Sequence, residues 1–151
     1  FENGSFTLNG VSHQHMGESI AANKKFSPVL FAKKYLNAPY LWGGRSLYGI
    51  DCSGLSQIAF KVNGIMLPRD SSDQIKLGES LNFIEEAKED DLAFFENDEG
   101  KIIHVGIMMD NQNIIHSSGK VRIDKIDHNG IFNEDINKYS HKLRLIKRVT
   151  E

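Results

Sequence analysis

The sequence predicts a single α+β domain in which N-terminal helices pack on an antiparallel β-sheet. Apolar residues recur at helical spacing only within residues 27–78, whereas strict alternation begins at Leu92. Runs of helices followed by runs of strands are typical of α+β proteins. With 151 residues, of which 40% are hydrophobic and 25% charged, the chain is long enough for one hydrophobic core.

Residues 1–26 are expected to be a linker or the tail of a preceding unit. A short alternating segment lies there between two Asn-Gly turn signals, and the polar stretch that follows has no period. His13 and His15 form a His-x-His pair, but because no third ligand is close in sequence, solvated histidines are the favoured interpretation. The folded domain is expected to span residues 27–151.

Three helices are expected in the first half of this domain. The first covers residues 27–37, since it begins with a Ser-Pro cap and stops before an Ala-Pro pair. The second covers residues 52–64, carries an apolar stripe on one face and ends at a glycine. In the third, residues 71–78, Ser71 and Gln74 resemble a capping box.

Alternating segments from residue 92 onward predict consecutive strands. They read "LAFFE", "KIIHVGIMM", "NIIHSS", "VRI" and "LRLIKRV", with turns around "NDEG" and "DNQN" between the first three. Tight turns join antiparallel neighbours, so the sheet is expected to be antiparallel. A net charge of -2 does not favour nucleic-acid binding, and no apolar run is long enough for a membrane span.

Cys52 is the only cysteine, so the chain forms no internal disulfide. It is expected at the start of the second helix with Asp51 as N-cap, where unpaired backbone N–H groups favour a thiolate. Such a cysteine is a candidate nucleophile. The alternative is a small buried hydrophobic residue, which is the usual role of a single cysteine.

Two histidines fall on neighbouring strands of the predicted sheet. Alternation places His104 on one face of "KIIHVGIMM" and His116 on one face of "NIIHSS", and a short turn brings the two imidazoles side by side. A Cys–His pair needs a third polar group to orient the base, and His116 fits that need. The alternatives are two buried core histidines, or a Cys–His–His metal site that lacks the fourth ligand of structural zinc.

The motifs resemble a known family. The motifs are "YLNAPYLWGGRSLYGIDCSGLSQIAFKVNGIMLPRDSSDQ", "EDDLAFFE", "IIHVGIMM" and "NIIHSSGKVRID". They are similar to the NlpC/P60 cysteine peptidases, a papain-like group of bacterial cell-wall hydrolases, and the similarity covers residues 28–125. Within this family the sequence looks closest to the γ-D-glutamyl-L-diamino-acid endopeptidases, or dipeptidyl-peptidases VI. "DCSG" together with "HVGI" is specific to the family, whereas "WGG" or "LPRD" alone would be weak evidence.

The resemblance implies a role for each matching residue. Cys52 would be the nucleophile, His104 the general base and then acid, and His116 the residue that orients His104. Asp51 would pair with the free α-amine of the substrate, although Asp70 also suits an ammonium, and Arg69 suits the α-carboxylate of D-Glu. The substrate-binding residues implied are Tyr40, which would line the oxyanion region, with Trp42, Asp51, Ser53, Arg69, Asp70 and Ser71.

Each pocket residue also has a purely structural alternative. Asp51 could serve only as an N-cap, and Asp70 and Ser71 only as caps of the third helix. Arg69 could be a solvated charge, and Trp42 a core residue. The pocket roles and these alternatives are equally weighted by the sequence.

The resemblance also implies an activity and its setting. The expected reaction is hydrolysis of the γ-D-glutamyl bond to meso-diaminopimelate or L-Lys in peptidoglycan stem peptides, with a free N-terminal L-Ala and no metal or cofactor. The expected partners are stem peptides or muropeptide fragments and upstream SH3-like domains. The expected location is the periplasm and cell envelope or outside the cell, or the cytoplasm if peptides are recycled. The alternatives are another amidase or acyltransferase, and a non-catalytic cell-wall binding module.

Overall fold

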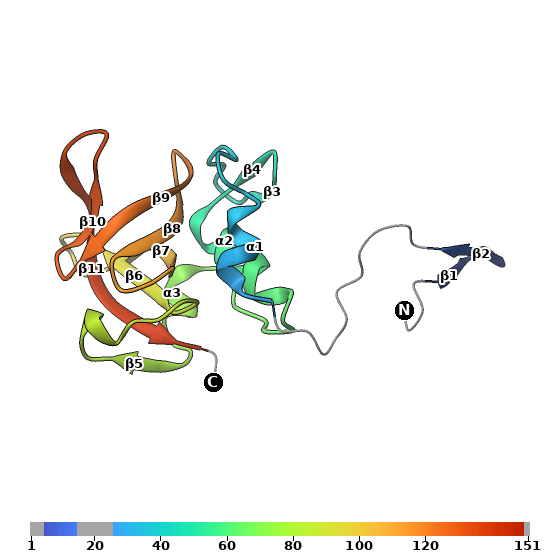
Figure 1. The fold of residues 1–151 in the computed structure, drawn as a ribbon, viewed down its shortest axis with the longest axis horizontal. Helices are drawn as coiled ribbons and strands as arrows, with labels where there is room; N and C mark the ends of the chain where they lie inside the picture. Colours follow the sequence, from blue (N-terminus) through green and yellow to red (C-terminus); the bar gives the residue numbers. More distant parts are fainter. Residues whose placement is uncertain (1–4, 15–25, 150–151) are drawn as a thin grey trace.

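The computed structural model describes residues 5–14 and 26–149. Within them, a seven-stranded antiparallel sheet forms the larger part of the fold, and the helices are short (Figure 1). The helices are α1 (Pro28–Lys33), α2 (Cys52–Lys61) and α3 (Ser71–Gln74), with a 3₁₀ turn at Ile84–Glu86. The strands are β1 (Ser5–Leu8), β2 (Val11–Gln14), β3 (Arg45–Ser46), β4 (Gly49–Ile50), β5 (Glu79–Leu81), β6 (Leu92–Glu96), β7 (Ile102–Met108), β8 (Asn113–Ser118), β9 (Lys120–Asp127), β10 (Gly130–Asn133) and β11 (Lys138–Arg148).

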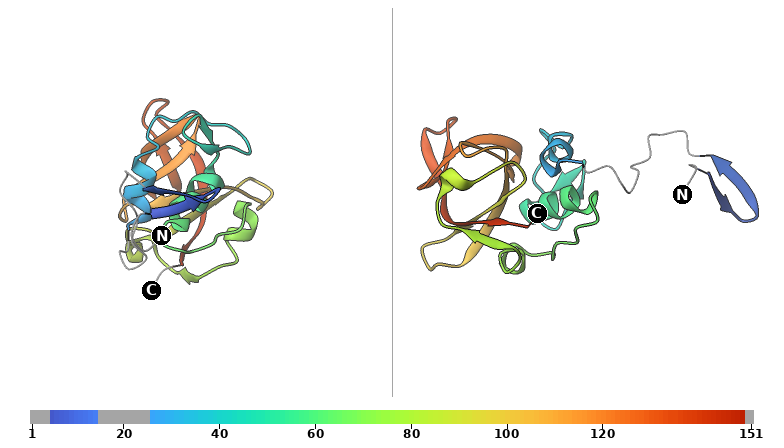
Figure 2. Two further views of the ribbon diagram at one scale, coloured as in Figure 1. Left: turned by 90° about the vertical axis from the view of Figure 1, so that its right-hand side faces the viewer. Right: turned by 60° about the horizontal axis from the view of Figure 1, so that its bottom comes forward.

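The large sheet closes on itself, which the sequence pattern does not predict. Its strand order is β10-β9-β8-β7-β6-β11-β5, and β10 also pairs with β11, so six strands form a ring that β5 extends (Figure 2). Gly130 makes this pairing possible, because its φ is +135° and a Cβ there would lie 1.8 Å from the carbonyl oxygen of His141. The four-residue strand β10 shows no clear alternation, so the closing strand leaves no signal in the sequence.

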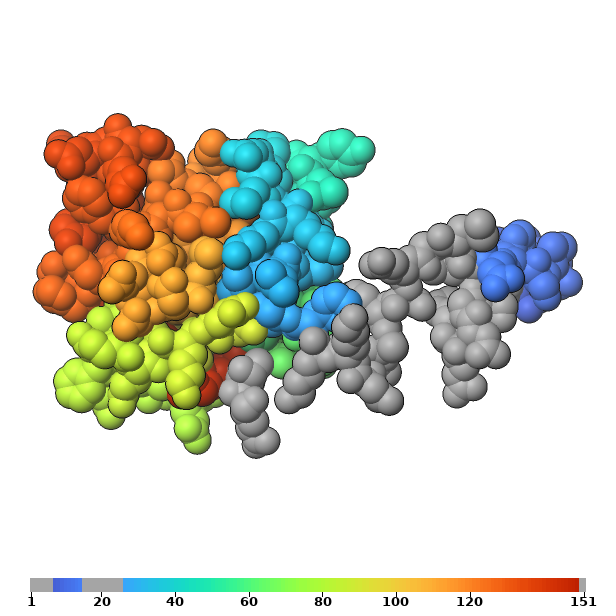
Figure 3. Space-filling model, viewed as in Figure 1, coloured from blue at the N-terminus to red at the C-terminus, as the bar shows by residue number. Residues whose placement is uncertain are grey.

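The first helix is shorter than predicted. α1 ends at Lys33 rather than near residue 37, because hydrogen bonds such as Leu36 N–H to the Lys33 carbonyl tighten the chain into 3₁₀-type turns. Asn37 then takes a φ of 68° and donates its N–H to the carbonyl of Val121 on β9. The space-filling view shows this blue-to-cyan segment directly beside the orange strands (Figure 3).

The capping box predicted for the third helix is wrong. The N-cap of α3 is Asp70 rather than Ser71, and the helix covers only Ser71–Gln74. Gln74 is fully buried instead: its Nε2 donates to the carbonyl of Ser53 at 3.1 Å, and its Oε1 accepts from the hydroxyl of Ser56 at 2.8 Å. This buried amide ties α3 to the start of α2.

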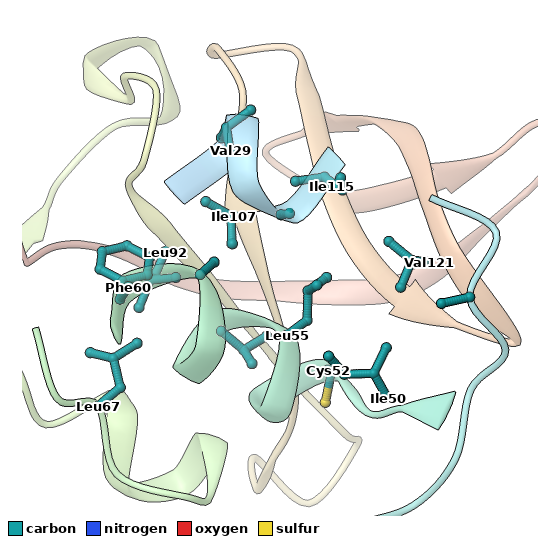
Figure 4. Close-up of a cluster of buried hydrophobic side chains, with 14 of the residues drawn as sticks. Val29, Ile50, Cys52, Leu55, Phe60, Leu67, Leu92, Ile107, Ile115 and Val121 are labelled. Atoms are coloured by element: carbon teal, nitrogen blue, oxygen red, sulfur yellow. The ribbon is translucent and has the colours of Figure 1, made fainter. Parts of the chain in front are cut away.

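Two hydrophobic clusters fill the fold. The first joins α1 and α2 to strands β7 and β8, and Figure 4 shows its members around Leu55 and Phe60. Val105 and Ile107 belong to this cluster, whereas Met108 belongs to the second, as alternation along β7 requires. The second cluster consists of Ala87, Ala93, Phe95, Met108, Ile114, Ile126, Ile131 and Ile146.

The N-terminal strands β1 and β2 form a hairpin of their own. Asn9 and Gly10 have φ values of 52° and 78°, which fits the turn that the Asn-Gly signal predicts. His13 lies exposed on β2, whereas His15 lies outside the described residues. That residues 1–26 are a linker or tail therefore stays a prediction. Among the described residues, no helix has the length and apolar character needed to cross a membrane.

Candidate active site

Cys52 is the first residue of α2, and local hydrogen bonds define this start. Asp51 is the N-cap, and its Oδ1 accepts the N–H of Gly54 at 2.7 Å. Gly54 is needed for close approach, since a Cβ there would lie 2.6 Å from the carbonyl oxygen of Gly44. Cys52 is only 7% exposed, and the nearby backbone N–H of Val105 on β7 favours the ionised form of its thiol. The thiol therefore lies where α2 meets β7.

His104 on β7 and His116 on β8 lie side by side, as the sequence predicts. Gly106 pairs with His116 across the two strands, which makes His104 the diagonal neighbour of His116 on the same face. His104 Nε2 and His116 Nδ1 are 2.8 Å apart, and the two residues are 4% and 1% exposed. The predicted juxtaposition is confirmed, while the catalytic roles stay predictions.

A buried acid behind His116 was not identified from the sequence. Asp124 on β9 accepts a hydrogen bond from His116 at 2.9 Å between Nε2 and Oδ2. Arg122 Nη2 donates to Asp124 Oδ1 at 2.8 Å, and its Nε lies 2.7 Å from Oδ2. The β8–β9 register could have revealed the acid, because the turn at Gly119 places Arg122 opposite His116 and Asp124 two residues further along the same face.

His141 on β11 is the second residue that sequence reasoning missed. Its ring stacks on His104 with a centroid distance of 4.1 Å and an interplanar angle of 27°. Its Nδ1 lies 2.9 Å from the hydroxyl of Ser140. No sequence signal points to this contact, because it depends on closure of the sheet through β10 and β11.

The three histidines do not form a coordinating set as they stand. Nitrogens of His104, His116 and His141 lie within 4.8 Å of one another, and the group does not include Cys52. Imidazole lone pairs lie in the ring plane, and metal–nitrogen bonds follow them. Because the rings of His104 and His141 are nearly parallel, both cannot direct a lone pair at one ion. In this arrangement His141 stacks on His104, and His104 lies at hydrogen-bonding distance from His116.

Burial sets the protonation states at the site. Burial raises the pKa of the Cys52 thiol, Asp51 adds to this, and the N–H of Val105 opposes it. Burial is the main cause that holds the pKa of His104 well below its usual value, and the neighbouring His116 and His141 add to it. Desolvation of the Cys52 thiol therefore outweighs the backbone N–H groups, which favour the thiolate as the sequence predicts. The described residues contain no hydrogen bond between Cys52 and His104.

Asp51 is fully engaged by the protein itself. Its Oδ2 accepts the N–H of Gly43 at 2.7 Å, and its Oδ1 accepts Arg69 Nη1 at 3.0 Å in addition to the helix cap. Arg69 Nη2 also reaches Oδ2, and Nη1 donates to the Ser53 hydroxyl at 2.8 Å. Burial opposes ionisation of Asp51, yet the Arg69 and backbone hydrogen bonds hold its pKa below the usual value. The residue that precedes Cys52 is thus part of an ion pair with Arg69.

The remaining predicted pocket residues differ in their exposure. Tyr40 is half-buried, and its pKa is raised by burial and then by the charges of Cys52 and Asp51. Trp42 is 83% exposed, so the core alternative for this residue is wrong. Asp70 is exposed and makes no capping hydrogen bond to α3. The following Ser71 is half-buried. Their substrate contacts stay predictions.

Comparison with known proteins decides the family. Residues 37–139 match the NlpC/P60 family. The chain belongs to the NlpC/P60 family. This NlpC/P60 domain is 45% identical over 85 residues to a γ-D-glutamyl-L-lysine dipeptidyl-peptidase of Bacillus subtilis, with 55% of the chain and 28% of that protein covered.

Solved NlpC/P60 structures share the fold. The structure of an NlpC/P60 family protein from Bacillus cereus superimposes with a TM-score of 0.67 at 28% identity, and covers 92% of this chain and 44% of that one. The NlpC/P60 domain of the peptidoglycan hydrolase SagA gives a TM-score of 0.60 at 29% identity, and covers 66% of this chain and 86% of that one. The predicted NlpC/P60 fold is confirmed. The chain spans only 28% and 26% of the length of the first two curated relatives.

Proposed function

We propose that this NlpC/P60 domain is a cysteine peptidase that cleaves the bond between γ-D-Glu and a diamino acid, meso-diaminopimelate or L-Lys, in peptidoglycan stem peptides. The observation that carries the proposal is the buried His104–His116 pair, next to Val105, whose backbone N–H is near enough to Cys52 to favour the ionised thiol. The name of the Bacillus subtilis relative supports the choice of bond, and that of SagA supports peptidoglycan as the source.

The chemistry needs four groups: the Cys52 thiol and backbone N–H, the His104 ring and the Tyr40 hydroxyl. The Cys52 thiol gives its proton to His104 as the sulfur attacks the γ-carbonyl carbon of D-Glu. The backbone N–H of Cys52 and the hydroxyl of Tyr40 stabilise the oxyanion. His104 then protonates the departing amine, which leaves a thioester that water hydrolyses with His104 as base. The hydrogen bond between Cys52 and His104 forms when substrate binds, since catalytic hydrogen bonds are often made only in the substrate complex.

Asp70 is the carboxylate best suited to the free α-amine of L-Ala. Asp51 is already bound by Arg69 and by two backbone N–H groups. Asp70, by contrast, is exposed, and its side chain makes no capping hydrogen bond to α3. An ammonium therefore binds Asp70 without breaking an existing ion pair. Asp51 acts on the pocket through Arg69 and through the start of α2.

Arg69 is placed to bind the α-carboxylate of D-Glu. Its side chain is 30% exposed although it pairs with Asp51, so part of the guanidinium faces the solvent side of the pocket. The Asp51 hydrogen bond raises the pKa of Arg69, which keeps the positive charge fixed. Ser53 and Ser71 line the pocket beside it, and the exposed Trp42 offers an aromatic rim.

The substrate indicates the setting of the domain. A peptidoglycan substrate places the protein in the bacterial cell envelope or outside the cell, in agreement with relatives named p60 and NlpC. The curated relatives are longer than this chain, which leaves room for the upstream SH3-like domains that we propose as partners of the pocket.

The test uses L-Ala-γ-D-Glu linked to L-Lys or to meso-diaminopimelate, each with a free and with an N-acetylated L-Ala. We expect release of the diamino acid from the free-amine peptides, and no release by Cys52→Ala. Asp70→Asn should raise the KM for the free-amine peptides, whereas Asp73→Asn, on the exposed side of the same helix, should not. Turnover by Cys52→Ala would reject the nucleophile. Equal rates on free and acetylated peptides would favour another amidase.

A further inference from the structure

A continuous buried chain of polar groups runs from β9 to the candidate base. Asp124 Oδ2 lies 2.9 Å from His116 Nε2, and His116 Nδ1 lies 2.8 Å from His104 Nε2. The three residues are 7%, 1% and 4% exposed. Water therefore does not compete for these hydrogen bonds, and each proton position fixes the next.

Asp124 is held in its ionised form at the far end of this chain. Burial opposes ionisation, yet hydrogen bonds from His116 and Arg122 keep the pKa of Asp124 below its usual value. Arg122 reaches both carboxylate oxygens and also pairs with Asp135 at 2.8 Å. An ionised carboxylate only accepts hydrogen bonds, so the proton between Asp124 and His116 sits on His116 Nε2.

With Asp124 ionised, two arrangements of protons are possible along the Asp124–His116–His104 hydrogen bonds. In the first, His116 is neutral, its Nδ1 accepts from His104 Nε2–H, and the lone pair of His104 is on Nδ1. In the second, His116 carries both protons as a cation, and the neutral His104 has its proton on Nδ1. Arg122 already pairs with the buried Asp124, and its other partner Asp135 is 73% exposed to solvent, so the buried carboxylate does not need a second cation beside it. Only the first arrangement leaves a base that can take the thiol proton.

We propose that Asp124 is a positioning residue that fixes the tautomers of His116 and His104, so that His104 Nδ1 is the nitrogen that receives the Cys52 proton. This inference rests on the proposed function for its catalytic meaning. Its structural content, the position of two protons, is independent of turnover. Cys52 loses its proton to His104 Nδ1, and the resulting imidazolium still donates from Nε2 to His116 Nδ1, so no further proton transfer is required.

The decisive experiment is ¹⁵N NMR of the histidine-labelled chain at neutral pH, with signals assigned through His104→Gln and His116→Gln. The wild-type chain should show a protonated Nε2 and an unprotonated Nδ1 on both rings. Asp124→Asn can present its NH₂ group to His116 Nε2, which forces the proton onto Nδ1, and both rings should change tautomer. A protonated Nδ1 on His104 of the wild-type chain would overturn the proposal even if the variant fails to fold.

Activity provides the second readout, with Asp135→Asn as the matched control. Asp135 binds the same Arg122, but its side chain is 73% exposed. We expect kcat to fall at least about 10-fold in Asp124→Asn with KM little changed, partial recovery in Asp124→Glu, and no change in the control. An unchanged kcat in a folded Asp124→Asn chain with altered tautomers would refute the catalytic meaning. A wild-type chain that hydrolyses no peptide would reject the proposed function, and the NMR result alone would then decide on Asp124.

Discussion

At Asp51, hydrogen bonding decides what a side chain is free to do. The sequence identifies this residue as a helix cap or as a substrate ligand, and the structure gives its oxygens to Gly54, Gly43 and Arg69. Cys52 and the histidine pair were likewise predictable, because each sits in a local pattern. His141 was not, because its partner His104 is distant in sequence and is reached only across the closed sheet.

Stability should depend on pH through His141. Burial lowers the pKa of His141 from 6.5 to about 4. Between these values His141 is protonated in the unfolded chain but stays neutral in the folded chain. The free energy of unfolding should therefore fall as the pH drops from 6.5 towards 4, with His141 contributing up to about 2 kcal/mol of loss by pH 5. His141→Phe keeps a stacked ring without the proton.

Urea unfolding of both chains at pH 7 and pH 5 measures this contribution. The wild-type chain should lose more stability between the two pH values than His141→Phe does. Equal losses would show that His141 titrates normally in the folded chain.

On the scale of one element, the start of α2 depends on a glycine. Helix α2 itself is predicted by the spacing of its apolar residues, but the contact of Gly54 with the Gly44 carbonyl is a tertiary feature. The β8–β9 hairpin shows the opposite case. Its turn at Gly119 fixes the register, so the neighbourhood of His116 and Asp124 could have been counted from the sequence.

Gly54→Ala should destabilise the chain, although alanine is the better helix former by about 1 kcal/mol. The added Cβ would lie 2.6 Å from the Gly44 carbonyl and 2.9 Å from Asp51 Oδ1, so the helix start must shift. We expect a loss of about 1 to 3 kcal/mol in urea unfolding, together with loss of peptide cleavage. Lys61→Ala, at the exposed end of the same helix, is the control and should be close to neutral. A stabilised Gly54→Ala chain would contradict the predicted clash.

For the whole molecule, the last strand holds distant parts together. β11 pairs with β6, β10 and β5, and Arg148 near its end reaches the buried Asp91 that precedes β6. The distances from Asp91 to Arg148 are 3.0 Å for Oδ1 to Nε and 2.7 Å for Oδ2 to Nη2. This ion pair is not visible in a local pattern, because Arg148 and Asp91 lie 57 residues apart in the sequence.

Arg148→Ala should therefore lower stability more than an ordinary surface substitution. Asp91 is 1% exposed and would be left without its cation, whereas Arg148 is 30% exposed, so we expect a loss of about 2 kcal/mol. Arg144→Ala, on the same strand, is the control. Arg144 is 57% exposed and pairs with Glu96, and Glu96 keeps Lys142 as a partner when the arginine is removed. Its effect should stay within about 0.5 kcal/mol. Equal unfolding midpoints for the two variants would refute a special contribution of the Arg148–Asp91 ion pair to stability.

The sequence by itself determined the α+β class, the helix that begins at Cys52, the histidine pair and the resemblance to NlpC/P60 peptidases. These features rest on periodicities, caps and turns, which act over a few residues. Only the tertiary structure decided the closed sheet, the pairing of Asp51 with Arg69 and the burial that raises the pKa of the Cys52 thiol. Burial and side-chain partners set these features, and both depend on which distant segments come together.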